Sequence, residues 1–202
     1  MLTNHYWYIP EALTPQQCDE IQHAAAHVEQ VDGFHFGHEE GHRNSQISWL
    51  YDQSTNDQFA ALMRQANSEA GWNYDLEIAE TVQYTRYLAE GHYDWHIDGN
   101  QDQHAARKFV SSIENPIPLN ITPFPKLQGT VRKLSTTVNL SPPEDYEGGQ
   151  LQIRCYDQLH IFNDTPRGSM IVFPSFMEHR VTRITKGERH AAVMWYNGYP
   201  LR

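Results

Sequence analysis

The sequence predicts a mainly β protein, in which a double-stranded β-helix of the jelly-roll type is backed by supporting N-terminal helices. From residue 77 onwards, short alternating segments are separated by Gly, Pro and Asn, which is typical of sandwiches and barrels. Before residue 74, two stretches repeat apolar residues at helical spacing. The length of 202 residues fits one domain, residues 1–202, that can bury a real core.

The first helix is expected over residues 14–28. Thr14 can serve as the N-cap, Pro15 suits the first helical position, and Gln17 completes a capping box. The apolar residues that follow lie at helical spacing: Cys18, Ile21, Ala25 and Val28. We expect this helix to support a sheet.

The second helix is expected over residues 56–70, with Gly71 as its stop. Its apolar stripe consists of Phe59, Leu62, Met63 and Ala66. Residues 1–74 are thus interpreted as a supporting part, and residues 75–202 as the jelly-roll core. The expected strands cover residues 6–9, 43–50, 77–87, 92–97, 132–140, 150–155, 169–173, 178–184 and 190–196.

Two segments lack any helical or strand period. Residues 99–130 carry four prolines and follow the strand expected at 92–97, so we interpret them as a flap over the mouth of an active site. An insertion without contact to substrate is the alternative. Residues 33–42 contain His35, His38 and His42 among three glycines, which favours a solvated loop over a metal-ligand cluster.

Charge and composition exclude several classes of function. The 15 basic and 25 acidic residues give a net charge of −10, so a nucleic acid is a poor partner. Eighteen apolar residues nowhere run together, and no secretion signal opens the chain, so no membrane partner is expected. Cys18 and Cys155 lie far apart without zinc spacing. These features predict a cytoplasmic protein in a reducing compartment.

A metal site is predicted from two distant parts of the chain. His96 and Asp98 are two residues apart, so that both would point to the same face of a strand. A second strand with His179 would complete a set of two imidazoles and one carboxylate, which leaves three positions free on an octahedral redox metal. Arg189, ten residues after His179, offers a planar cation suited to a carboxylate. An ordinary strand histidine and an exposed Arg189 are the alternatives.

Together with flanking residues, these four positions resemble the iron(II)- and 2-oxoglutarate-dependent dioxygenases. The resemblance is closest to the prolyl 4-hydroxylase branch, including the hydroxylases called PKHD-type, and implies a cupin-like jelly roll. The matching pieces follow one another in order between residues 83 and 198. They are Tyr87, Gly91, Tyr93, His96 and Asp98, then residues 134–141 and 148–151, then residues 173–175, 179–181, 187–189 and Trp195.

The resemblance implies the cofactors. Fe(II) would be held by His96, Asp98 and His179, and the far carboxylate of 2-oxoglutarate would pair with Arg189. Molecular oxygen is the other co-substrate, and ascorbate is a candidate reductant. The implied reaction decarboxylates 2-oxoglutarate to succinate and CO2 and hydroxylates a C–H bond.

Further site residues follow from the same resemblance. Tyr87 stands where relatives place a tyrosine that contacts 2-oxoglutarate, and Thr137 or Ser135 is expected to hydrogen-bond the far carboxylate beside Arg189. Four residues are assigned to the substrate pocket: Tyr93, Arg132, Asn139 and Trp195. In several animal relatives the position of Asn139 is a tyrosine, so that contact is replaced or lost here. A purely structural role is the alternative for Arg132 and Trp195.

Hydroxylation of a prolyl residue in a peptide or protein is the predicted function. Within the same chemistry, a lysyl residue or a free amino acid is the rival substrate. A jelly-roll binding protein with a structural metal or none is the alternative from another class. Trp49 is interpreted as a core residue, with the lining of the substrate cleft as its other reading.

Overall fold

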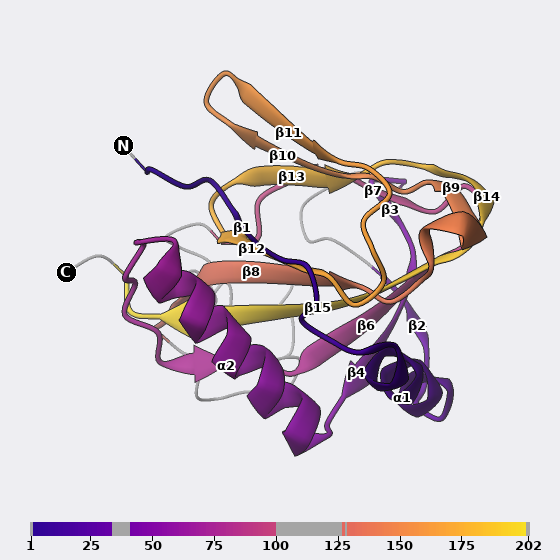
Figure 1. The fold of residues 1–202 in the computed structure, drawn as a ribbon, viewed down its shortest axis with the longest axis horizontal. Helices are drawn as coiled ribbons and strands as arrows, with labels where there is room; N and C mark the ends of the chain where they lie inside the picture. The colour runs from indigo at the N-terminus through magenta and orange to yellow at the C-terminus, as the bar shows by residue number, and fades with distance from the viewer. Residues whose placement is uncertain (1, 34–40, 100–126, 128, 201–202) are drawn as a thin grey trace, which may run out of the picture.

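The computed structural model describes residues 2–33, 41–99, 127 and 129–200 (Figure 1). Most of the expected flap, residues 99–130, lies outside this part, as do His35 and His38. In the part that is described, no helix is long and apolar enough to cross a membrane.

Two β-sheets face one another, as the jelly-roll prediction requires. The larger sheet contains, in spatial order, β1 (Trp7–Ile9), β12 (Met170–Pro174), β8 (Val131–Asn139), β15 (Arg189–Gly198), β6 (Val82–Tyr87), β4 (Gln46–Leu50) and β2 (Val31–Asp32), with β5 (Ile78–Ala79) paired to β15. The smaller sheet contains β11 (Gln158–Phe162), β10 (Leu151–Cys155), β13 (Glu178–Val181), β7 (His92–His96) and β3 (Arg43–Asn44). A third, two-stranded sheet pairs β9 (Tyr146–Gly148) with β14 (Ile184–Gly187). The short helical turn η3 (Pro143–Asp145) lies directly before β9.

Both predicted helices are confirmed, and both cover the outer face of the larger sheet (Figure 1). Helix α1 (Pro15–Ala26) has the predicted capping box between Thr14 and Gln17, but it ends two residues before Val28. Helix α2 (Gln53–Glu69) begins three residues earlier than predicted. The reason is a different N-cap, because the Asp52 carboxylate accepts from the backbone N–H of Thr55.

The side chains between helices and sheet form the main core. On β15, Ala192, Met194 and Tyr196 point to the helices. The alternate residues of this strand therefore point to the smaller sheet, because side chains alternate between the two faces. The space between the sheets is thus where Arg189 and Trp195 are directed.

Three expected strands are each divided in two. The stretch 43–50 forms β3 and β4, and the chain crosses between the sheets at Ser45. The stretch 77–87 forms β5 and β6, and the stretch 178–184 forms β13 and the start of β14. Three short strands were not predicted: β2, β9 and β11.

Candidate active site

Three predicted metal ligands lie together between the sheets. His96 ends β7, His179 lies opposite it on β13, and Asp98 follows β7 by two residues. One ligand atom from each side chain lies within 4.8 Å of the others, and all three residues are buried. Among the described residues this is the one such cluster of His, Cys, Asp or Glu. The set therefore has the composition and the spacing of a centre that could hold a metal ion.

The two histidines are held in an orientation that suits ligation. The Nδ1 atom of His96 lies 2.7 Å from the carbonyl oxygen of Asp94. The Nδ1 atom of His179 lies 3.0 Å from the carbonyl oxygen of Met177. A carbonyl can only accept, so each Nδ1 carries a proton, and Nε2 is the ring nitrogen turned toward the cluster. Both Nε2 atoms face Asp98, at 3.7 Å from Oδ1 for His96 and 3.2 Å from Oδ2 for His179.

Asp98 reaches the cluster from a bend and not, as expected, from a strand with His96. The backbone N–H groups of Asp98 and Gly99 both donate to the carbonyl oxygen of Ser175, which ends the pairing of β7. Burial opposes ionisation of Asp98, yet His179, His96 and Arg132 hold the pKa of its carboxyl well below the ordinary value. The carboxylate is therefore charged, as a metal ligand has to be.

Arg189 opens β15 and is 4% exposed. Its guanidinium makes no hydrogen bond or ion pair with any of the described residues, although buried cations are normally paired. Its Cζ lies 5.8 Å from the centre of the Tyr87 ring, across the pairing of β15 with β6. Gly149 makes room for it, since a Cβ there would lie 3.0 Å from the Cδ of Arg189. An anion is the group that this arrangement lacks.

The predicted hydroxyl partners of Arg189 lie elsewhere along the sheet. Thr137 is opposite Val193 and Ser135 is opposite Trp195, four and six residues further along β15. At about 3.3 Å per residue their backbones lie about 13 and 20 Å from that of Arg189 along the sheet. The Ser135 hydroxyl is bonded to that of Ser175 at 2.9 Å. A hydroxyl closer to Arg189 in the register is that of Thr85 on β6, which lies opposite Ala191 on β15.

Tyr93 packs directly on His96, one of the three predicted metal ligands. Its ring is stacked on that of His96, with centroids 3.5 Å apart and 13° between the planes. On Tyr93 lies the guanidinium of Arg43, 4.5 Å from the ring centre. Arg43 also donates to Gln83 of the larger sheet. This stack fixes the plane of the His96 imidazole.

Arg132 and Trp195 lie beside the cluster, but Arg132 is already paired. Its guanidinium donates to both carboxylate oxygens of Glu80, at 2.6 and 2.8 Å. It lies over the Trp195 ring at 3.8 Å. Trp49 is 6.3 Å from the same ring, is partly exposed and packs in none of the apolar clusters of the described residues, so it belongs to this wall and not, as expected, to the core. Glu80 was missed in the sequence, where no motif marks it.

Asn139 is turned to the backbone of neighbouring loops. Its side-chain N–H groups donate to the carbonyl oxygens of Ser141 and Thr165, at 2.8 and 2.6 Å. Its Oδ1 is buried and has no hydrogen-bond partner among the residues described. The amide therefore stabilises loops at one end of β8.

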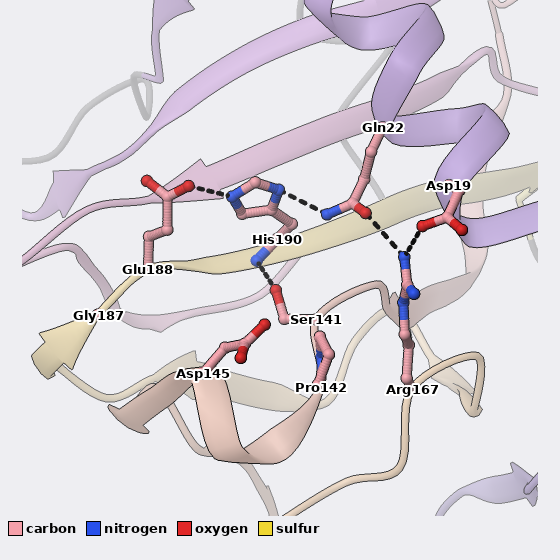
Figure 2. Close-up of a pocket in the computed structure, with 9 residues that line it drawn as sticks. All are labelled: Asp19, Gln22, Ser141, Pro142, Asp145, Arg167, Gly187, Glu188 and His190. Atoms are coloured by element: carbon pink, nitrogen blue, oxygen red, sulfur yellow. Dashed lines mark hydrogen bonds and ion pairs between the residues drawn. The ribbon is translucent and has the colours of Figure 1, made fainter. Parts of the chain in front are cut away.

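A second polar region lies on the outer face, beside α1 (Figure 2). A pocket of about 650 Å³ is lined by Asp19, Gln22, Ser141, Pro142, Asp145, Arg167, Gly187, Glu188 and His190. It contains none of the three clustered ligands and not Arg189. We therefore separate it from the candidate active site.

The hydrogen bonds across this pocket form a directed chain (Figure 2). Arg167 can only donate, so it fixes Oε1 of Gln22 as an acceptor at 2.9 Å. The Gln22 amide then donates to Nδ1 of His190 at 2.7 Å, and Nε2 of His190 donates to Glu188 at 2.9 Å. His190 is neutral in this chain, because burial lowers its pKa more than Glu188 raises it.

Comparison with known proteins places these features in context. A sequence profile described as the 2OG-Fe(II) oxygenase superfamily matches residues 82–197. A PKHD-type hydroxylase of Hyphomonas neptunium is 47% identical over 62 residues, 31% of this chain and 27% of that relative. The PKHD-type hydroxylase PiuC of Pseudomonas aeruginosa is 24% identical over 196 residues, 93% of this chain and 76% of that relative.

Solved structures show the same architecture. The viral collagen prolyl hydroxylase of Paramecium Bursaria Chlorella virus-1 has a TM-score of 0.67 at 19% identity and covers 97% of both chains. A prolyl-4-hydroxylase of Pseudomonas putida has a TM-score of 0.66 at 21% identity, over 96% of this chain and 92% of that one. At such identities the likeness confirms the jelly-roll fold.

Proposed function

The chain belongs to the 2OG-Fe(II) oxygenase superfamily, and from this premise we propose that it hydroxylates a prolyl residue of a peptide or protein. Membership makes it an Fe(II)-dependent dioxygenase with 2-oxoglutarate and O2 as co-substrates. The non-catalytic binding protein is therefore no longer an alternative. The coupled products are succinate, CO2 and a hydroxylated substrate.

The assignment of the site rests on two buried and chemically complementary features, a cluster of possible metal ligands and a buried cation. His96, Asp98 and His179 offer two imidazole nitrogens and a carboxylate within 4.8 Å. Such a donor set suits ferrous iron, which would supply the redox chemistry that side chains lack. The cation of Arg189 suits the far carboxylate of 2-oxoglutarate.

Residues around the proposed site orient the two histidines and form a wall beside the proposed co-substrate position. The carbonyl oxygens of Asp94 and Met177 hold each imidazole through Nδ1, so that Nε2 is the nitrogen that would bind a metal. Tyr93 holds the plane of His96, and Tyr87 lies beside Arg189 as a wall for the co-substrate. Of the two expected hydroxyl partners of the far carboxylate, Thr137 is the nearer to Arg189 in the sheet register, and the Ser135 hydroxyl is hydrogen-bonded to that of Ser175.

The names of structurally similar proteins support a prolyl residue as the substrate. Two structurally similar proteins are prolyl hydroxylases, and a third, from Trichoplax adhaerens, was solved with a peptide fragment. A lysyl residue and a free amino acid remain rivals. The free thiols Cys18 and Cys155 support the proposed cytoplasmic location.

The test is a coupled assay with the purified full chain. Fe(II), 2-oxoglutarate and O2 are expected to yield succinate, and a proline-containing peptide is expected to gain one oxygen atom by mass spectrometry. Peptides with Ala or Lys at the same position, and free proline and lysine, are the comparison substrates. Asp98→Ala is the inactive control. Succinate without oxygen transfer to any prolyl peptide would contradict the substrate proposal alone, whereas no metal-dependent turnover would contradict the site.

A further inference from the structure

Glu80 is a buried carboxylate that the reaction itself does not use. It is 5% exposed and lies between β5 and β6, on the side of the larger sheet that faces the metal ligands. Both of its oxygens are occupied: Oε1 accepts from Nε of Arg132 and from the amide of Asn197, and Oε2 accepts from Nη2 of Arg132. This is a two-pronged ion pair in which the acid side is fully satisfied.

Arg132 is at the same time a neighbour of the metal ligand Asp98. A Cβ placed on Gly99 would lie 2.5 Å from the carbonyl oxygen of Arg132 and 3.2 Å from its Cβ, so the two backbones are in contact. Burial opposes the charge of Arg132, yet Glu80 and then Asp98 raise the pKa of its guanidinium. Arg132 is thus paired with Glu80, and its backbone lies against the residue that follows Asp98.

The choice between these two carboxylates matters for metal binding. An arginine has five N–H donors and cannot lose its charge, so an Arg132 without Glu80 would need another buried anion. Asp98 is the other carboxylate that acts on it. A carboxylate engaged by a guanidinium offers fewer lone pairs and less charge to a metal ion.

We propose that Glu80 is a positioning residue of the metal site, whose carboxylate holds the Arg132 guanidinium so that Asp98 stays free to bind the metal. The inference rests on the proposed metal ligands. The Asn197 amide adds to the orientation of Glu80, and the Trp195 ring covers one face of the guanidinium at 3.8 Å. The guanidinium is thereby held at its edge by Glu80 and on one face by Trp195.

The proposal is tested by the affinity for Fe(II), measured by titration calorimetry of the full chain without oxygen and without 2-oxoglutarate. Glu80→Ala is expected to weaken binding by about 10- to 100-fold, the effect typical of losing a group that orients a ligand. The double variant Glu80→Leu with Arg132→Met removes the competing cation together with its partner. Its Fe(II) affinity is expected to return close to that of the unsubstituted chain.

Controls separate this role from a purely structural one. Glu90→Gln removes a carboxylate from the exposed pair with Arg183 and is expected to leave Fe(II) affinity unchanged. Thermal unfolding and circular dichroism report whether each variant is folded. Where Glu80→Ala does not fold, Glu80→Gln takes its place, since the amide keeps the shape and removes the charge.

The outcomes are distinct. Weaker binding by the single variant and recovery in the double variant support the proposal. Unchanged binding by the single variant overturns it, and so does a double variant that binds as weakly as the single one. If the unsubstituted chain binds no Fe(II), the proposed function fails before the role of Glu80 is reached.

Discussion

Arg189 and His190 are neighbours in the chain, but their side chains leave opposite faces of β15. Arg189 points between the sheets toward Tyr87, whereas His190 joins the outer chain of hydrogen bonds that includes Gln22 and Glu188. The backbone N–H of His190 also donates to the Ser141 hydroxyl at 2.8 Å. Arg189, the proposed anchor of the co-substrate, lies at the start of β15. The hydrogen bonds of His190 therefore hold this end of the strand from the outer face of the sheet.

Replacing Arg189 is expected to separate co-substrate affinity from stability. Arg189→Met should raise the dissociation constant of 2-oxoglutarate roughly 10- to 150-fold, because a charge-assisted hydrogen bond contributes about 1.5–3 kcal/mol. Without 2-oxoglutarate, the same variant should unfold at no lower temperature, since it removes a buried cation that has no partner in the described chain. Titration calorimetry and thermal unfolding measure the two effects.

Arg183→Met is the matched control, because Arg183 is exposed and pairs with Glu90. It should change neither quantity appreciably. An Arg189→Met chain that binds 2-oxoglutarate normally would show that the anchor is a different residue.

His190 should make stability depend on pH between about 7 and 5. Burial lowers its folded pKa below the ordinary 6.5, so the unfolded chain binds the extra proton first as the pH falls. The contribution is complete above 6.5 and is lost as the pH falls below it toward the folded pKa. Glu188, whose pKa is lowered from 4.5 by Arg86 and His190 against the effect of burial, acts with the same sign at lower pH.

His190→Gln is expected to flatten this dependence, because glutamine does not titrate. Urea unfolding at a series of pH values gives the free energy of unfolding of both chains. A loss between pH 7 and 5 that is equal in the two chains would assign the titration to other histidines.

The clustering of His96, Asp98 and His179 could be predicted because the evidence lay in residue types and spacing. His96, Asp98, His179 and Arg189 each have a chemistry that few other residues share, and the flanking motifs fix their order. The position of Asp98 on a strand was predicted wrongly. The carbonyl of Ser175, 77 residues away, captures the N–H groups that would have continued β7, and no local pattern encodes that contact.

The residues that contact the site from distant parts of the chain could not be predicted, because no local pattern encodes such contacts either. Glu80 meets Arg132 across 52 residues, and neither belongs to a short motif that names the other. Ser135 and Thr137 were expected near Arg189 because they share a strand face, but only the register with β15 shows how far along the sheet they lie. The early start of α2 was missed because the prediction began the helix at Asn56 and residues 53–55 are all polar, so they do not extend the apolar stripe. Asn56 donates to the Leu50 carbonyl oxygen and accepts from the backbone N–H of Val82.

Binding of Fe(II) should stabilise the fold measurably. At about 100 times its dissociation constant, a ligand of the native state adds about 2.7 kcal/mol. For a chain of 202 residues this corresponds to a rise of roughly 5–10 °C in the unfolding temperature. Differential scanning fluorimetry with and without a chelator, under argon, gives the shift.

The shift should vanish in His179→Ala, which lacks one of the proposed ligands. His23→Ala removes an exposed histidine of α1 and should keep it. A shift that survives in His179→Ala would place the metal elsewhere.

Gly149 offers a steric test of the Arg189 site that leaves all charges in place. Gly149 has a φ of +61°, and an added Cβ would lie 2.3 Å from Cδ1 of Ile184 and 3.0 Å from Cδ of Arg189. Gly71, with a φ of +74° and nothing within 4 Å of an added Cβ, bears the same backbone penalty in open space. Gly149→Ala and Gly71→Ala should each lose about 1–2 kcal/mol of stability from the left-handed backbone. Only Gly149→Ala should also weaken 2-oxoglutarate binding, because the methyl group displaces the Arg189 side chain from its place beside Tyr87. Equal affinities for 2-oxoglutarate in the two variants, measured by calorimetry on the Fe(II)-loaded chains, would mean that the carboxylate does not depend on the observed position of Arg189.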